Sequence, residues 1–252
     1  MFRGDDRGVS EVLGFVLVFS LIVASVGIVV TAGLGGLQDM RDGERVTNGE
    51  RALDVLAENY DDVLTGAPSR STQIRLSDAS LRVGDPVAFR VDNGTGTLNR
   101  SEETSRISFV VGDEAVHFVN GAVIRESPGG AVMLREPTGV LDAETMVVHQ
   151  TEFYTRGVPA VVGGGDRTVQ VRLYRRGQPG VSVDPDSTTV IHNVTTDADT
   201  IGAWRRHYGS RDGVICNTTE NVDGADRDRL SCEFTTVEEL RIVSHDVALA
   251  IE

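Results

Sequence analysis

Histidines are the side chains of this 252-residue chain best suited to metal binding or acid–base chemistry. The five are scattered along the sequence, at His117, His149, His192, His207 and His245. No two of them form an HExxH or another closely spaced ligand pair, and a GxSxG nucleophile motif is absent, so we expect no metal, no cofactor and no enzymatic activity. A bound metal or a deep polar pocket would instead favour an ectoenzyme.

The two cysteines, Cys216 and Cys232, are the only ones in the chain. A single pair in an oxidising compartment is typical of one structural disulfide. By the chain-entropy model, a loop of this size would stabilise the fold by about 3 kcal/mol. Two buried free thiols are the alternative, whereas neither CxxC spacing nor a neighbouring histidine supports a zinc site.

Four Asn-x-Ser/Thr sequons are potential acceptors of N-linked glycans. They begin at Asn93, Asn99, Asn193 and Asn217. Glycosylation requires that this part of the chain faces outward. Whether the sequons can be used therefore depends on the orientation of the protein in the membrane.

Residues suited to proteolytic processing lie near the N-terminus. Arg7 and Gly8 end a short basic stretch, the small residue Val9 follows, and Glu11 stands immediately before a long apolar segment. This arrangement resembles the class III signal peptide of type IV pilins. It is most similar to the N-terminus of archaeal, particularly haloarchaeal, type IV pilin-like proteins.

The resemblance implies cleavage after Gly8 by a prepilin peptidase on the cytoplasmic face, which would remove residues 1–8 as a leader. The apolar helix over residues 9–37 would be kept, and it would pack with the helices of other pilin subunits in a filament core. Glu11 would become the third residue of the mature chain and could meet the amino group of a neighbouring subunit. Bacterial pilins carry their acid at the fifth mature position, so this sequence departs from the bacterial pattern.

The apolar segment is long enough to span a membrane. From Val12 to Leu37 there is no charged residue, and at about 1.5 Å per residue such a helix crosses a ~30 Å hydrocarbon core. Arg3 and Arg7 precede the segment, and acidic residues outnumber Arg41 just after it. Because cationic flanks stay in the cytoplasm, we expect a single-pass cell-membrane protein with everything from Asp39 onward outside.

Two other interpretations of this segment stay open. A plain membrane anchor tolerates a lone acid such as Glu11, because a helix N-terminus carries partial positive charge. A secretory signal has an apolar core of about 7–15 residues, and the run here is longer.

Beyond the apolar segment, the pattern predicts a second helical region over residues 38–67. The apolar side chains of GERALDVLAENYDDVL recur at helical spacing from about residue 46 to 65, at Leu53, Leu56, Tyr60, Val63 and Leu64. Three glycines, at positions 33, 35 and 36, could end the first helix or let it bend. In a pilin, the apolar stripe of the second region would pack against the head.

Residues 68–252 predict a β-rich extracellular head. Apolar and polar residues alternate in short runs, and turn pairs such as Asn120-Gly121 separate them. The stretch Thr196–Tyr208 breaks this pattern and predicts one short helix capped by Asp197 or Asp199. The expected fold class is therefore α+β, with a long N-terminal helix and a mainly antiparallel, sandwich-like head.

The charge of the chain excludes one class of partner. The formal net charge is −14 at a sequence pI near 4.8, so nucleic acid would be repelled. All 24 basic residues are arginine. An acidic, lysine-free chain is typical of a salt-loving organism, and codon bias from a GC-rich genome is the alternative.

Together these patterns favour a type IV pilin-like subunit of an archaeal surface filament, with adhesion as a consequence. The long head favours a minor pilin or pseudopilin. The partners expected are the membrane, the prepilin peptidase and other pilin subunits. The alternative is an extracellular binding module, held singly in the membrane, that does not polymerise.

Overall fold

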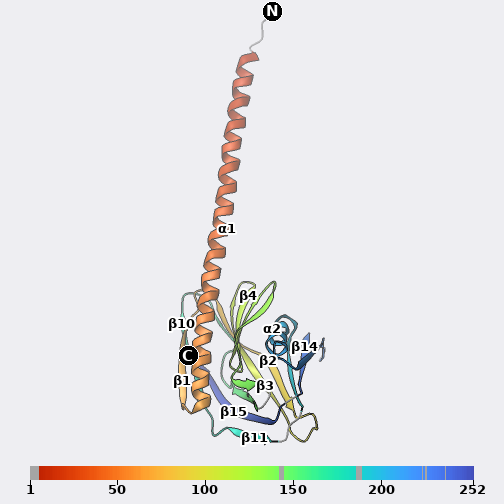
Figure 1. Cartoon of the computed structure of the whole chain (residues 1–252). Coiled ribbons are helices and arrows are strands. Elements are labelled where there is room, and N and C mark those ends of the chain that lie inside the picture. Colours follow the sequence, from red (N-terminus) through yellow and green to blue (C-terminus); the bar gives the residue numbers. More distant parts are fainter. Residues whose placement is uncertain (1–5, 142–144, 186–188, 223, 225, 236) are drawn as a thin grey trace, which may run out of the picture. The chain divides into compact units, whose positions relative to one another are not determined.

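A computed structural model of the chain (Figure 1) describes residues 6–141, 145–185, 189–222, 224, 226–235 and 237–252. For residues 6–11, 31–35, 37 and 39 it describes the backbone alone. The chain divides into two units, residues 1–44 and the head unit, residues 45–252.

One helix, α1 (Asp6–Thr65), includes the apolar segment and the amphipathic one. The sequence left open whether the glycines at 33, 35 and 36 end the first helix, and the structure continues the helix through all three. Glycine keeps its backbone donor and acceptor, so the ladder of helical hydrogen bonds is not interrupted. The cost of about 1 kcal/mol for each glycine is small in a helix of this length.

In the first unit, the apolar side chains of α1 that the structure describes are exposed. Val12–Val30 is long and apolar enough to cross a membrane, and none of it is buried. The largest exposures are those of Phe15 and Leu21, each at 71%. This segment therefore needs lipid or protein around it.

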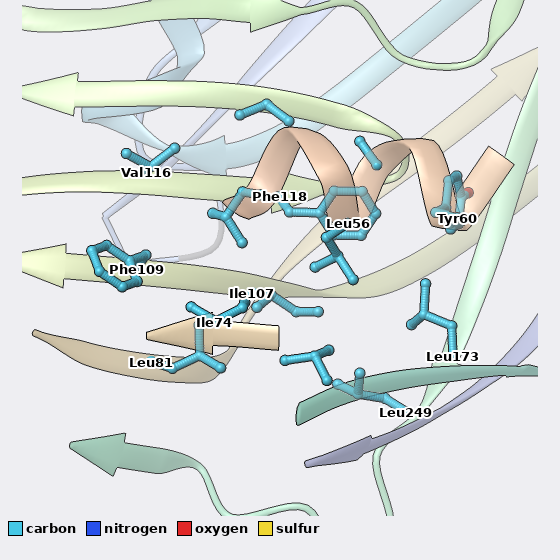
Figure 2. Packing of buried hydrophobic residues seen from close by; sticks show 14 of the residues in the cluster. Leu56, Tyr60, Ile74, Leu81, Ile107, Phe109, Val116, Phe118, Leu173 and Leu249 are labelled. Carbon is cyan, nitrogen blue, oxygen red and sulfur yellow. The ribbon is translucent and has the colours of Figure 1, made fainter. Parts of the chain in front are cut away.

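In the head unit, the last turns of α1 pack into a first hydrophobic core. Leu53, Leu56, Tyr60, Val63 and Leu64 are all buried, so the predicted stripe is confirmed. Figure 2 shows Leu56 and Tyr60 on the helix, facing the side chains of the surrounding strands. The Tyr60 hydroxyl donates to Asn120 Oδ1 at 3.2 Å and lies 2.6 Å from Thr151 Oγ1.

The strands form two sheets, which confirms the predicted β-rich, mainly antiparallel head. The small sheet has the order β1-β10-β15-β8-β7, with β11 also paired to β15. All its pairs are antiparallel except β15 with β8. Its strands are β1 (Ser69–Arg75), β7 (Gly139–Leu141), β8 (Thr145–Tyr154), β10 (Thr168–Arg175), β11 (Gly180–Asp184) and β15 (Glu239–Ile251).

The large sheet has the order β13-β14-β12-β2-β3-β4-β5-β6, with β9 also paired to β2. Its strands are β2 (Ser80–Asp92), β3 (Asn99–Val111), β4 (Glu114–Val119), β5 (Ala122–Ser127), β6 (Gly130–Arg135), β9 (Val161–Gly163), β12 (Val190–Asp197), β13 (Val214–Thr219) and β14 (Arg227–Phe234). The predicted Asn120-Gly121 turn joins β4 to β5, and both residues have positive φ, as a two-residue type I′ hairpin requires.

The predicted short helix is α2 (Ala198–Gly209), which packs on β6, β12, β13 and β14. Asp197 caps it, because Asp197 Oδ1 accepts a hydrogen bond from the Thr200 amide at 3.0 Å. The single tryptophan, Trp204, is fully buried in a second core between α2, the large sheet and the first halves of β8 and β15. The structure thus has two cores, one under α1 and one under α2.

Candidate functional site

The predicted processing residues lie at the start of α1. The backbone of Arg7, Gly8, Val9 and Glu11 is helical, and their side chains lie outside the described part of the chain. Residues 1–5 of the expected leader also lie outside the described residues. What the structure adds is the exposed apolar segment Val12–Val30 that follows them.

Cys216 and Cys232 occupy directly opposed positions on the antiparallel strands β13 and β14. Their Cα atoms are 4.1 Å apart, and their sulfur atoms form a disulfide. Because β13 ends the large sheet, the bond ties an edge strand to its single neighbour in the strand order. Cys232 is fully buried in the second core, whereas Cys216 is half-buried.

The four sequons differ in accessibility. Asn93 is 4% exposed, and its Nδ2 donates to Thr97 Oγ1 at 2.7 Å and to Asp184 Oδ2 at 2.8 Å. A glycan is attached through this nitrogen, so the folded head leaves no room for one at Asn93. Asn99 and Asn217 are exposed, and Asn193 is half-buried on the central strand β12.

Two of the scattered histidines meet in the fold. His149 on β8 and His245 on β15 have nearly coplanar rings, with His149 Nδ1 2.9 Å from His245 Nε2. One of these nitrogens must donate to the other, so a proton on both is excluded. Burial lowers the pKa of both rings, that of His245 to about 4 with further contributions from His149 and Arg175.

His192 and His207 lie in the second core, beside Tyr208 of α2. Burial, with a smaller contribution from the nearby His207, lowers the pKa of His192 to about 3. Burial and the charge of Arg211 lower the pKa of His207 to about 4, against the opposing effect of Glu136. Both rings are therefore neutral in the folded head near pH 7.

The fifth histidine joins an arrangement that the sequence did not reveal. Three consecutive strands of the large sheet, β3, β4 and β5, bring Ser108, His117 and Glu126 together. His117 Nδ1 lies 2.9 Å from Ser108 Oγ, and His117 Nε2 lies 2.8 Å from Glu126 Oε2. Ser108 and His117 are 4% and 3% exposed. The alternation of apolar and polar residues could have shown which face of its own strand each of Ser108 and His117 occupies. Only the register between β3 and β4 makes the two residues neighbours.

All three side chains line a cavity of about 280 Å³. Most of its lining is polar, and it includes Arg82 and Arg106. Arg106 is 8% exposed; its Nη1 bonds to Asp197, and its Nη2 lies 3.6 Å from Asp85. Its buried Nε has no hydrogen-bond partner among the described residues.

No group of three or more histidine, cysteine, aspartate or glutamate side chains that could hold a metal ion occurs among the described residues. This finding extends only to the described chain, so the expectation that the protein needs no metal stays a prediction.

Comparison with family models gives one informative result. A model described as a family of unknown function (DUF7289) matches residues 7–250, and the chain therefore belongs to this family. Comparisons with curated proteins and with solved structures found no match.

Proposed function

We propose that this DUF7289 protein is a type IV pilin-like subunit of an archaeal cell-surface filament, made with an eight-residue leader and retained through its apolar helix. The observation that carries the proposal is the exposed segment Val12–Val30 directly behind Arg7, Gly8 and Glu11. An anchor alone explains the segment, whereas a pilin-like signal also explains the residues in front of it.

The exposed apolar segment Val12–Val30 needs a cover that keeps it out of water. Burying one leucine, isoleucine or phenylalanine side chain stabilises by about 1.5–3 kcal/mol, so a helix with this many exposed apolar side chains is not left in water. Lipid supplies the cover while the protein is in the membrane. Identical helices can supply it in a filament core, so transfer from one to the other keeps the apolar surface dry.

The small residues of the segment favour such packing. Gly14 and Gly27 have no atom within 4 Å of the position that a Cβ would occupy, so a second helix could approach closely at either one. The head would then be displayed outward. Its size supports a minor pilin or pseudopilin, with adhesion through the head as a further role.

The alternative is the same head held singly in the membrane as a binding module. It needs no prepilin processing and makes no filament. Processing at Gly8 therefore separates the two functions.

The test is to determine the N-terminal residue of the protein in native membranes by mass spectrometry, with and without the prepilin peptidase of the host. We expect a start at Val9 that is lost without the peptidase. A Gly8→Val variant should stay uncleaved, whereas the matched control Gly14→Val, the same change inside the helix, should be processed normally.

If the N-terminal residue is Met1 both with and without the peptidase, the pilin function is rejected and the anchored module remains. A start near residue 33 would mean ordinary secretion. If the protein starts at Val9 but never appears in isolated filaments, processing is correct and polymerisation is rejected.

A further inference from the structure

The hydrogen bonds at His117 define the proton positions of the Ser108–His117–Glu126 group. An ionised carboxylate only accepts hydrogen bonds, so His117 Nε2 must carry a proton and donate it to Glu126 Oε2 at 2.8 Å. In the neutral imidazole, Nδ1 is then the acceptor, and the Ser108 hydroxyl donates to it at 2.9 Å. A serine hydroxyl held against a histidine that a carboxylate orients is the arrangement of an activated nucleophile.

The strand register holds this group firmly. Ser108 lies directly opposite His117 across β3 and β4, and directly opposite Arg82 across β3 and β2. Arg106 precedes Ser108 by two residues, so its side chain lies on the same face of β3. All three side chains come from strands and none from a loop, and a group built on paired strands keeps its geometry well.

The cavity beside Ser108 could receive a small substrate. Its volume of about 280 Å³ is close to the lower limit for small-molecule sites. The wall carries charges of both signs, since Arg82 and Arg106 line it together with Asp85, Asp113 and Glu114. Arg106 is already paired with Asp197 and Asp85. The exposed Arg82, directly opposite Ser108 across β2 and β3, is the cation that would stabilise negative charge on a carbonyl oxygen attacked by Ser108.

We propose that Ser108 is a catalytic nucleophile and that the head hydrolyses small carboxylic esters in this cavity. His117 acts as the general base, Glu126 is a positioning residue that fixes the histidine tautomer, and Arg82 stabilises the oxyanion. This activity is independent of whether the protein forms filaments.

The reaction balances with water as the only co-reactant. Ser108 Oγ forms a bond to the acyl carbon while its proton moves to His117 Nδ1. The bond from the acyl carbon to the alcohol oxygen then breaks, and the alcohol leaves with the proton from Nδ1. Water attacks the acyl-serine by the same route, His117 again takes and returns the proton, and the carboxylic acid is released.

The test uses the full chain in detergent micelles with two probes, a fluorophosphonate and p-nitrophenyl acetate. The fluorophosphonate should form an Oγ–P bond at Ser108 with loss of fluoride, and peptide mass spectrometry should find the label there. Ser108→Ala should abolish labelling and ester hydrolysis. The matched control Ser101→Ala, on the exposed part of the same strand, should leave both unchanged.

The roles of His117 and Glu126 are tested by the rate of ester hydrolysis in variants of each residue. His117→Asn should slow hydrolysis by at least about 100-fold, as expected for a lost general base. Glu126→Gln should lower kcat for p-nitrophenyl acetate and leave KM unchanged, because the variant side chain has the same size and only the carboxylate that fixes the histidine tautomer is lost. A purely structural Glu126 would change KM together with kcat.

The proposal is overturned if the wild-type protein takes up no label, or if the label persists in Ser108→Ala. Labelling of His117→Asn at the wild-type rate would also overturn it. Circular dichroism of each variant separates loss of activity from loss of fold, and a misfolded His117→Asn leaves the decision to the location of the label in the wild-type protein.

Discussion

Gly49 on α1 lies directly against the ring of Phe109 on β3, so close that a Cβ at Gly49 would be 2.4 Å from Phe109 Cδ1. Glycine normally weakens a helix by about 1 kcal/mol relative to alanine. Here the helix can meet the sheet only because the Cβ is missing. Gly49→Ala should therefore destabilise the head, by about 1–3 kcal/mol as in other overpacked cores, measured by urea unfolding.

Gly43 provides the matched control for this prediction. It lies in the same helix with nothing within 4 Å of its Cβ position. Gly43→Ala should be neutral, or stabilising by up to about 1 kcal/mol, because alanine is the better helix former. Equal effects of the two substitutions would contradict the close packing of Gly49 on Phe109.

Removal of the Cys216–Cys232 disulfide should weaken the head. The two residues are separated by 16 positions, and the chain-entropy model gives a loss of about 3 kcal/mol for a loop of this size. Cys216→Ser with Cys232→Ser should lower the urea midpoint. The reduced wild-type protein should behave like the double variant, and an unchanged midpoint in both would show that the bond does not stabilise the fold.

Acid should destabilise the head through its buried histidines. The pKa of His192, His207 and His245 is lowered in the folded state, to about 3 for His192 and about 4 for the other two. The unfolded chain, with ordinary histidine pKa values near ~6.5, therefore binds more protons, so stability falls as pH drops from about 6.5 to about 4. Between about pH 7.5 and about pH 5.5, each such histidine should lower the free energy of unfolding by about 1 kcal/mol.

The matching variant is His192→Phe, which cannot take up a proton. Its unfolding free energy, measured by urea titration, should decline less between the two pH values than that of the wild-type protein. Near pH 7.5 the wild-type histidine is neutral, so the difference in unfolding free energy between His192→Phe and the wild-type protein at that pH measures the change in packing alone. A decline as steep as in the wild-type protein would exclude His192 as a source of the acid sensitivity.

Glycans should appear on exposed sequons and not on the buried one. Asn99 and Asn217 are exposed, whereas both Nδ2 hydrogen bonds of Asn93 are made within the head. Glycopeptide mass spectrometry of the protein from its native host should find occupancy at Asn99 or Asn217 and none at Asn93. A glycan on Asn93 would mean that modification precedes folding.

The difference in burial between Asn93 and Asn217 also predicts how substitution of each residue changes the stability of the head. Asn93→Gln should destabilise by about 1–3 kcal/mol, because a longer side chain cannot keep the buried hydrogen bonds to Thr97 and Asp184. Asn217→Gln on the exposed face of β13 should be close to neutral. Thermal unfolding of the two variants in a host without glycosylation distinguishes these outcomes.

Local features of the fold could be predicted from the sequence because short-range physics decides them. The spacing of Leu53, Leu56 and Tyr60 predicts which face of α1 is buried, and all three are fully buried. The Asn120-Gly121 pair predicts a tight hairpin, and Asp197 caps α2 through the Thr200 amide. Each of these depends on residues within a few positions of one another.

Long-range pairing could not be predicted in this way. Alternation identifies strands but does not tell which strands become neighbours, so neither the parallel pairing of β15 with β8 nor the division into two sheets follows from the pattern. The Ser108–His117–Glu126 group was missed for the same reason. Its three members have no motif spacing and meet only through the register of three strands.

The position of β15 has a consequence for the order of folding. This strand pairs with β8, β10 and β11, all of which come before it in the chain. Until residues 239–251 are in place, the small sheet lacks the member that joins its other strands, and the first core lacks Val247 and Leu249. The small sheet is therefore completed late, whereas the consecutive hairpins of β3, β4 and β5 can form without β15.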